Sequence, residues 1–450
     1  MNPIYPSVSG TTAAATTTAT ATANAARPAS GGGEIVIARS AYDAAVRRQM
    51  HDNAAYAIGR CRWQETLAGR QLLVEELEVV RGIPGGFTRS PLDSYLVLRV
   101  EQGRSGSSAS ELLDRIQPLR SQYAVALVIQ EGPPTGWDAC LQSPGGDRVS
   151  IDTVAVQGPA PLHLSRASSA EQLEPLGAED KARWSRTAGA LGEEVFARVR
   201  RSRVNVIGAG RNGTLCATML AGLGVSQIRL IDGDTLESHN QIGTLGIDTC
   251  DIGRSKAAAL AHTLHRQRPD LTLSAWDKSL LDEGMLADLR RRPADLVLTS
   301  VDDDAARLAG WLLASALLVP HLDVASAILA GPTDRQLLGD VRLFVPGRGN
   351  GCPVCVGGVG NLEETLYALN APPGSLRRGE ATEWHEHRAG SLIGLNSIVV
   401  GAAMQLWLDY LSGRCRSSAW QRLRWQPSNG LLSDSAAVAS GANCRFCERR

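Results

Sequence analysis

Residues 203–256 read RVNVIGAGRNGTLCATMLAGLGVSQIRLIDGDTLESHNQIGTLGIDTCDIGRSK, and this stretch decides the fold of the chain. An apolar run at Val204–Ile207 predicts a buried strand, and a glycine turn and a helix follow it. A second strand is predicted over Gln227–Ile231. Strand, glycine turn, helix and strand together form a nucleotide-binding βαβ unit, so we expect an α/β fold built on a parallel sheet.

Three glycines form the turn between the first strand and the helix. Gly208, Gly210 and Gly213 give the pattern G-x-G-x-x-G. The first two allow a tight turn and close approach of the backbone to a phosphate, and the third lets the helix pack on the strand. The helix N-terminus adds free amides and a positive dipole end. By itself this pattern is also typical of NAD(P)-dependent oxidoreductases.

Charged residues after the predicted strands favour ATP over NAD(P). Asp232 and Asp234 end the second strand, Asn240 and Lys256 follow in the next loop, and a third predicted strand ends before Asp302. A hydride-transfer enzyme needs one carboxylate for a ribose hydroxyl. An enzyme that uses ATP also needs a lysine to neutralise phosphate charge and a carboxylate to hold Mg²⁺.

These residues resemble the ThiF/MoeB adenylyltransferases, whose fold the ubiquitin-activating enzymes share. The family pattern comprises a leading R-Y-x-R-Q segment, G-x-G-x-x-G, D-x-D, S-N-L-x-R-Q, a lysine, a T-D-N strand end and two C-x-x-C pairs. The resemblance runs from Glu179 to the C-terminus. The leading segment here reads RWSRT from Arg183, the strand end reads VDD from Val301, and Arg307 matches a following arginine.

The resemblance implies which residues bind ATP and Mg²⁺: Gly208, Gly210, Gly213, Asp232, Asp234, Asn240, Lys256 and Asp302. Asp234 would bind the ribose, Asn240 and Lys256 would bind the phosphates, and Asp302 would hold Mg²⁺. Catalysis would depend on Arg186, Lys256 and Asp302. In the family, the arginine matched by Arg186 usually reaches the site from the other subunit of a homodimer.

One position departs from the family pattern. With Asn240 and Lys256 in register, the phosphate-binding arginine of the family falls on Gly243 and its glutamine on Thr244. Two arginines of this chain can supply the missing charge, Arg211 in the glycine turn and Arg254 beside the lysine. The departure keeps open an alternative in which the chain is a catalytically disabled nucleotide-binding scaffold.

Two C-x-x-C pairs predict a metal site, formed by Cys352, Cys355, Cys444 and Cys447. Four thiolates satisfy a tetrahedral Zn²⁺ ion. The resemblance implies a structural zinc clip that ties the chain's tail to the sheet. A redox role is disfavoured, because neither pair opens a helix after a strand in a thioredoxin-like unit.

The other cysteines bear on whether the chain forms a thioester. In ubiquitin-activating relatives, the segment between the two C-x-x-C pairs lies near the adenylate and can carry a nucleophilic cysteine, but here it carries none. Cys250, six residues before Lys256, is the remaining candidate. Cys216 on the first helix is predicted to be core. The simpler expectation is transfer of the acyl group to a cysteine of another protein.

Composition narrows the class of protein. The chain has 450 residues and a formal net charge of zero, so no bulk field favours nucleic acid or an anionic membrane. Nine cysteines are too few for a disulfide scaffold, and no charged-then-apolar N-terminal signal is visible, which predicts a cytoplasmic setting. The longest apolar stretch, SLIGLNSIVVGAAMQLWL, predicts a core helix and not a membrane span.

Four parts are predicted along the chain. Residues 1–33 are rich in Ala, Thr, Ser, Pro and Gly and are predicted to be disordered. Residues 34–164 are predicted to form a smaller N-terminal α+β domain that begins with a helix over Ala41–Ile58. Residues 165–182 are polar and are interpreted as a linker. Residues 183–450 form the ThiF-type adenylation domain, Rossmann-like with its zinc clip.

The N-terminal domain faintly resembles the JAB/MPN fold of metal-dependent isopeptidases. The resemblance rests on AAYAIGRC followed by GRQLLVEELEVV. A working isopeptidase needs an H-x-H-P segment to bind zinc, and the corresponding position reads IQEGP. We therefore expect a degenerate domain that acts as a docking surface.

The resemblance implies acyl activation as the function. A ubiquitin-like or sulfur-carrier protein would present its flexible C-terminus to the α-phosphate of ATP, and the activated acyl group would pass to a conjugating-type partner. The additional N-terminal domain favours a prokaryotic ubiquitin-like conjugation system. An NAD(P)-dependent oxidoreductase is the less favoured alternative, because Lys256 and the second acidic strand end have no use in hydride transfer.

Overall fold

The structure is a computed structural model that describes most of the chain between residues 34 and 446. The described ranges are 34–51, 55–66, 69–81, 94–102, 108–116, 123–131, 136–165, 178–241, 243–330, 335–347, 349–370, 391–426, 429–441 and 444–446. The tail predicted to be disordered, residues 1–33, lies outside these ranges, as do Cys447 and most of the predicted linker.

The second half of the chain is built on an eight-stranded sheet. Its order is β13-β12-β11-β14-β15-β16-β17-β18, with strands β11 (Arg203–Ile207), β12 (Gln227–Ile231), β13 (Thr272–Trp276), β14 (Leu296–Thr299), β15 (His321–Ala330), β16 (Arg335–Phe344), β17 (Ala419–Gln426) and β18 (Gly430–Ala437). Strands β11 to β15 are parallel, and β16 to β18 add antiparallel pairs. Strand order reverses between β11 and β14, which is where ligands bind in open α/β sheets.

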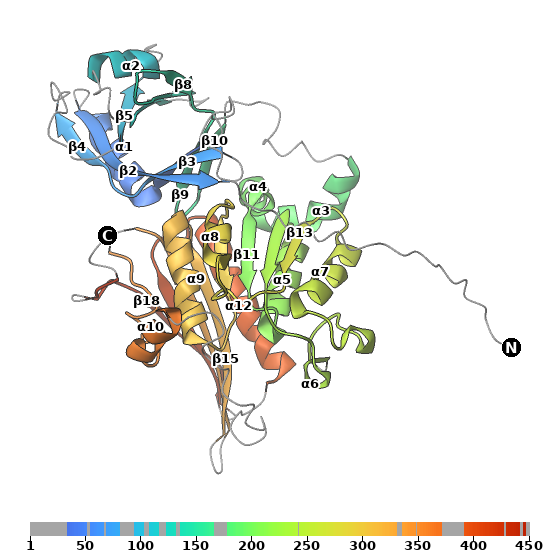
Figure 1. The fold of residues 1–450 in the computed structure, drawn as a ribbon. Helices are drawn as coiled ribbons and strands as arrows, with labels where there is room; N and C mark the ends of the chain where they lie inside the picture. The colour runs from blue at the N-terminus through green and yellow to red at the C-terminus, as the bar shows by residue number, and fades with distance from the viewer. Residues whose placement is uncertain are drawn as a thin grey trace. The chain divides into compact units, whose positions relative to one another are not determined.

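Helices cover both faces of this sheet (Figure 1). Helices α4 (Glu193–Arg201), α5 (Arg211–Leu223), α7 (Lys256–Gln267) and α12 (Ile393–Leu411) share one hydrophobic core. Helices α8 (Met285–Arg290) and α9 (Asp304–Leu317) share the core on the other face. Alternation along β11 explains the two layers, because Val204 and Val206 enter the first core and Ile207 the second. The predicted Rossmann-like fold is confirmed.

A ten-stranded mixed sheet forms the N-terminal part. Its order is β10-β9-β1-β3-β2-β5-β6-β7-β8 with β4 paired to β2; the strands are β1 (Glu34–Ala38), β2 (Ala55–Thr66), β3 (Gly69–Val74), β4 (Glu78–Arg81), β5 (Ser94–Gln102), β6 (Tyr123–Glu131), β7 (Gly136–Gln142), β8 (Arg148–Ser150), β9 (Thr153–Gln157) and β10 (Leu162–Ser165). Helices α1 (Arg39–His51) and α2 (Ala109–Ile116) pack on it through separate apolar clusters. The part is α+β, as expected, and its likeness to a JAB/MPN fold stays a prediction.

One helix prediction was wrong in extent. The helix predicted over Ala41–Ile58 ends at His51, and β2 begins at Ala55 because this segment pairs with β4 and β5. The helical segment before β11 is broken at Gly192, whose φ of 78° lies outside the helical region. The break separates α4 from α3 (Ala178–Leu191), which begins inside the predicted linker.

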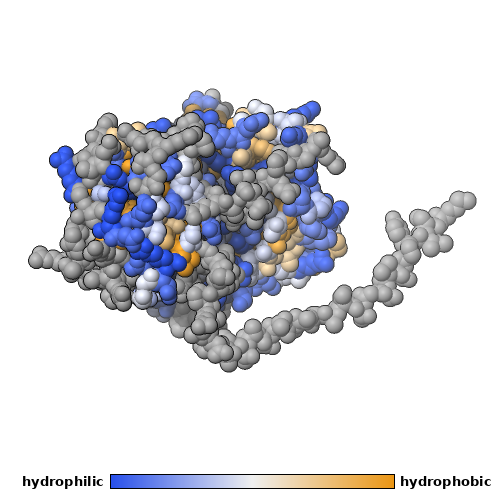
Figure 2. Space-filling model, turned by 90° about the horizontal axis from the view of Figure 1, so that it is seen from above, coloured by the Kyte–Doolittle hydropathy of each residue, from blue (hydrophilic) through white to orange (hydrophobic). Residues whose placement is uncertain are grey.

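The surface of the described residues is mixed in character. In the view of Figure 2, hydrophilic side chains predominate and hydrophobic ones are scattered among them. No helix in the described ranges combines the length and the apolar character needed to span a membrane.

Candidate nucleotide site and cysteine cluster

The glycine turn after β11 has the close contacts that only glycine permits. Gly208 has a φ of 92°, and a Cβ there would lie 2.3 Å from the Ser300 carbonyl oxygen. A Cβ on Gly213 would lie 1.8 Å from the Gly208 carbonyl oxygen. Helix α5 begins directly after Gly210, which has no side chain to cap the first amides. Those amides are therefore available to an anion.

Asp232 holds the turn and the end of β12 together. Its Oδ2 accepts a hydrogen bond from the Ala209 amide at 2.6 Å, and its Oδ1 accepts one from the Asp234 amide at 2.7 Å. The first acidic residue of D-x-D is thus engaged by the backbone on both sides. We infer that Asp232 positions the turn, and that Asp234 is the carboxylate better placed to meet a ligand.

Asp234 and Lys256 form an ion pair beside the turn. The Lys256 Nζ lies 2.8 Å from Asp234 Oδ2, and the Lys256 amide donates to the Asp234 carbonyl at 2.9 Å. Both side chains are partly buried, 15% exposed for the lysine and 32% for the aspartate. The residues predicted to bind phosphate and ribose are therefore brought together, although 22 positions separate them in the sequence.

The three aspartates after β14 have different surroundings. Asp303 caps helix α9, because its Oδ1 accepts from the Ala305 amide at 2.8 Å. Asp304 pairs with Arg307 and accepts from the Gly360 amide. Asp302 is exposed and takes neither of these roles. Carboxylate oxygen suits Mg²⁺, so Asp302 is the member of the run that fits the predicted metal role best.

Asn240 lies in the short helix α6 (Ser238–Gln241). Its Oδ1 accepts from the Glu237 amide at 3.0 Å, and its carbonyl accepts from the Thr244 hydroxyl at 2.6 Å. The turn that follows contains Gly243 at a φ of 88°. Asn240 and Thr244 therefore shape this turn through local hydrogen bonds.

The structure distinguishes the two arginines that can supply charge near Gly243. Arg211 donates to the carbonyls of His239, at 3.1 Å, and Ser391, at 3.4 Å, and a Cβ on Gly243 would lie 3.5 Å from its Nε. Arg254 instead pairs with Asp251 at 2.9 Å, and its side chain is 57% exposed. Arg211 is the arginine that lies beside Gly243.

A series of hydrogen bonds begins at Asn212, the residue after Arg211 in the glycine turn. Asn212 donates to Ser326 Oγ at 3.0 Å, and Ser326 Oγ donates to Asn396 Oδ1 at 2.8 Å. The side-chain amide nitrogen of Asn396, Nδ2, then donates to Ser391 Oγ at 2.8 Å. Sequence reasoning missed this network. Its signal in the sequence was Asn396, a polar residue in the mostly apolar helix α12 that the structure shows to be buried.

Arg186 lies apart from these residues in the single chain. It is exposed on α3, and among the described residues it makes no hydrogen bond or ion pair to the candidate site. Its neighbour Trp184 packs on Phe196 and next to Gly224, which caps the C-terminal end of α5. The predicted role of Arg186 stays a prediction that involves a second subunit.

A buried charge cluster that the sequence did not predict lies between β14, β15 and β16. Asp323 is fully buried and pairs with Arg307 at 3.1 Å and Arg342 at 2.7 Å. Burial alone would raise the pKa of the Asp323 carboxyl, but the two arginines outweigh burial and lower it. Arg307 also donates to the Val301 carbonyl next to Asp302. The cluster therefore anchors the loop that carries the predicted Mg²⁺ ligand.

His321 joins this cluster as a neutral group. The pKa of His321 is lowered to about 4: burial is the largest cause, Asp323 opposes it, and Arg307 and Arg342 add to the lowering. The Thr299 hydroxyl donates to Asp323 Oδ1 at 2.8 Å. Because that hydroxyl has a single proton, the 2.8 Å contact with His321 must be a donation from Nε2 to Thr299.

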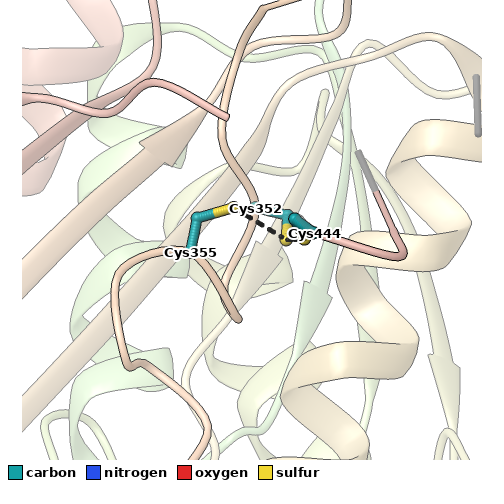
Figure 3. Close-up of side chains that lie close together, drawn as sticks. All are labelled: Cys352, Cys355 and Cys444. Atoms are coloured by element: carbon teal, nitrogen blue, oxygen red, sulfur yellow. Dashed lines mark hydrogen bonds between the residues drawn. The ribbon is translucent and has the colours of Figure 1, made fainter. Parts of the chain in front are cut away.

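Three cysteines, two after β16 and one after β18, lie close together (Figure 3). Cys352 Sγ lies 3.7 Å from Cys355 Sγ and 3.6 Å from Cys444 Sγ. The Gly441 amide donates to Cys355 Sγ at 3.3 Å, a contact typical of thiolate ligands. Three sulfurs within 4.8 Å of one another suit a tetrahedral Zn²⁺ ion. The predicted fourth ligand, Cys447, lies outside the described residues.

The remaining cysteines divide into core and surface. Cys216 is fully buried, which confirms its predicted place in the core, and burial raises the pKa of its thiol. Cys250 is exposed in the short 3₁₀ helix Thr249–Asp251. Its role as a thioester residue stays a prediction.

Known proteins resemble this chain over its second half. One relative, the sulfur carrier protein ThiS adenylyltransferase of Escherichia coli K12, is 30% identical over 41% of this chain and 80% of that protein. Ubiquitin-like modifier-activating enzyme 5 of Gallus gallus is 25% identical over 48% of this chain and 52% of that enzyme. ATP-dependent ubiquitin transferase-like protein Cap2 of Enterobacter hormaechei is 28% identical over 29% of this chain and 22% of that protein.

A solved structure of E. coli MccB with AMPCPP and MccA aligns with 62% of this chain and 76% of that chain, at 17% identity and a TM-score of 0.44. The sequence profile of the ThiF family matches residues 184–414, which hold the glycine turn, the Asp234–Lys256 pair and the first two clustered cysteines. The match covers more than half of the residues of this chain, and the chain therefore belongs to the ThiF family.

Proposed function

We propose that this chain uses ATP to adenylate the C-terminal carboxylate of a ubiquitin-like or sulfur-carrier protein. The observation that carries the proposal is the Asp234–Lys256 pair at the mouth of a glycine turn, within a domain of the ThiF family. The names of the relatives support the substrate class, because they include a sulfur-carrier adenylyltransferase and a ubiquitin-like modifier-activating enzyme.

The chemistry needs positioning and charge stabilisation more than proton transfer. The carrier's carboxylate is already an anion at pH 7, so it attacks the α-phosphorus of ATP without a general base. A carboxyl oxygen–phosphorus bond forms, the bond to the leaving pyrophosphate breaks, and an acyl adenylate remains. Lys256, Asn240 and the amides of the glycine turn would stabilise the charge on the phosphates. Mg²⁺ held by Asp302 would screen the same oxygens.

The later steps belong to partners. The acyl group would pass to a cysteine of a conjugating-type protein, and the system would be a prokaryotic ubiquitin-like conjugation pathway in the cytoplasm. Arg186 would enter the site from the second subunit of a homodimer. Cys352, Cys355, Cys444 and Cys447 would hold a structural Zn²⁺ ion. The N-terminal part would serve as the docking surface.

ATP–pyrophosphate exchange tests the proposal. Exchange would be measured on the purified chain with and without candidate ubiquitin-like proteins encoded nearby. We expect carrier-dependent exchange, reduced on the order of 100-fold or more in Lys256→Ala and Asp302→Ala. Lys181→Ala removes an exposed lysine outside the site and is the matched control.

Other outcomes identify the alternatives. If folded protein binds ATP but shows no exchange with any carrier, the chain is a disabled scaffold, as the glycine at position 243 suggests. If it binds NAD(P) tightly and does not respond to ATP·Mg²⁺, it is an oxidoreductase and the proposal is wrong.

A further inference from the structure

Arg211 has unusual electrostatic surroundings for an arginine at this end of the sheet. Lys256 pairs with Asp234, and Arg254 pairs with Asp251. Arg211 has no carboxylate partner among the described residues, and its hydrogen bonds go to two main-chain carbonyls. Carbonyl dipoles orient the guanidinium but do not neutralise its charge.

The position of Arg211 makes this charge harder to accommodate. Arg211 is the first residue of α5, directly after Gly210 in the turn. A helix N-terminus carries a partial positive charge and free amides, so it repels a cation and attracts an anion. The Arg211 guanidinium is half-buried beside this helix end and meets no carboxylate among the described residues, so its position becomes favourable once an anion lies over the turn.

The two carbonyls fix the direction of the guanidinium. They belong to His239, in the short helix α6, and Ser391, just before α12, so the side chain is held from two separate segments. Gly243 lies next to its Nε and places no side chain against the guanidinium. The arginine is thus oriented in advance and keeps donors for a further acceptor.

We infer that Arg211 contacts the phosphates of a nucleoside triphosphate bound at the glycine turn. A guanidinium forms paired, charge-assisted hydrogen bonds to phosphate oxygens, which matches a cation without a carboxylate partner. The inference rests on the proposed function in one respect, that ATP binds at this turn.

Nucleotide binding by the full-length protein tests the inference without any carrier. The affinities for ATP·Mg²⁺ and for adenosine would be measured by calorimetry for the wild type, Arg211→Gln, Arg211→Lys and Arg254→Gln. Arg211→Gln keeps hydrogen-bond donors for the two carbonyls and removes the charge. Arg254→Gln makes the same change of charge at an arginine that already has a carboxylate partner.

We expect Arg211→Gln to weaken ATP·Mg²⁺ binding roughly 10- to 100-fold while leaving adenosine binding nearly unchanged. Arg211→Lys should retain part of the ATP affinity, and Arg254→Gln should behave as wild type. If the wild type and both Arg211 variants bind ATP with equal affinity, the inference is wrong but the proposed function is not affected. An equal loss for ATP and adenosine would assign Arg211 a structural role and also overturn it. A wild type that binds neither ligand would overturn the proposed function as well.

Discussion

At Gly213 the first turn of α5 approaches the preceding loop more closely than any side chain permits. We expect Gly213→Ala to destabilise the protein by about 1–3 kcal/mol, because the added Cβ would meet the Gly208 carbonyl and must displace backbone. ATP binding should fall with it, since the same turn presents the amides. The measurement is the free energy of unfolding in urea together with ATP affinity.

Gly222, in the same helix, is the matched control. A Cβ there has open space, and the residue is exposed. Gly222→Ala should stabilise the helix by about 0.5–1 kcal/mol through its higher helix propensity. If the two alanine variants unfold alike, close packing at Gly213 does not explain its glycine.

Single residues were predictable from sequence where the chemistry itself requires one residue type. The glycine turn follows from its spacing, and the resemblance to the ThiF family implied that Lys256 and Asp234 serve one site. The division of roles among Asp302, Asp303 and Asp304 does not, because it depends on which carboxylate meets the Ala305 amide and which meets Arg307. Those contacts are set by packing and leave no local pattern.

At the scale of strands, β14 and β15 share a pH-sensitive contact between Thr299, His321 and Asp323. The folded pKa of His321 is about 4, and its unfolded pKa is about 6.5. As the pH falls, the unfolded state therefore takes up a proton first. The contribution of His321 to stability is complete above about pH 6.5 and is lost as the pH falls toward 4.

Replacing His321 should remove this component of the pH dependence. The loss for one histidine is about 1.4 kcal/mol per pH unit in this range, or about 2 kcal/mol between pH 7 and pH 5. His321→Gln keeps a donor for Thr299 and does not titrate. The difference in free energy of unfolding between this variant and the wild type should therefore shift by that amount in favour of the variant between pH 7 and pH 5. Urea unfolding at both pH values measures this. His265→Gln, at an exposed position, should show no such change.

Secondary structure was predictable in proportion to how strongly each segment is patterned. The strand predicted over Gln227–Ile231 is confirmed with its bounds, because its apolar residues Ile228, Leu230 and Ile231 lie between a glycine and an acidic turn. The helix predicted to continue to Ile58 was wrong, since Ala55–Ile58 is apolar enough for either structure. Pairing with β4 and β5 decides it, and that pairing is not visible in the local sequence.

At the scale of the whole molecule, the cysteine cluster joins segments far apart in the sequence. Cys352 and Cys444 are 92 residues apart, and their sulfurs lie 3.6 Å from each other. A metal held by sulfurs so far apart in the sequence binds only the folded chain, so its binding free energy adds to the stability of the folded state. Trp311 and Phe446 pack edge to face at 6.1 Å in the same region.

We expect the purified protein to hold zinc and Cys444→Ser to lose it. The lost metal should lower the thermal midpoint, and a chelator should lower that of the wild type in the same way. Zinc content by mass spectrometry and thermal unfolding are the measurements. Cys415→Ser changes a cysteine outside the cluster and should keep its zinc. Wild-type protein without zinc, or Cys444→Ser with full zinc, would contradict the proposed site.

The order in which the ribosome makes the chain has a consequence for the second sheet. β16 is synthesised well before β17, its neighbour, and β18 and Cys444 come later still. Until then, β16 offers its hydrogen-bonding edge to whatever strand is near, and open edges of this kind promote aggregation. Nascent chains that stall between Phe344 and Ala419 should therefore depend on chaperones for solubility.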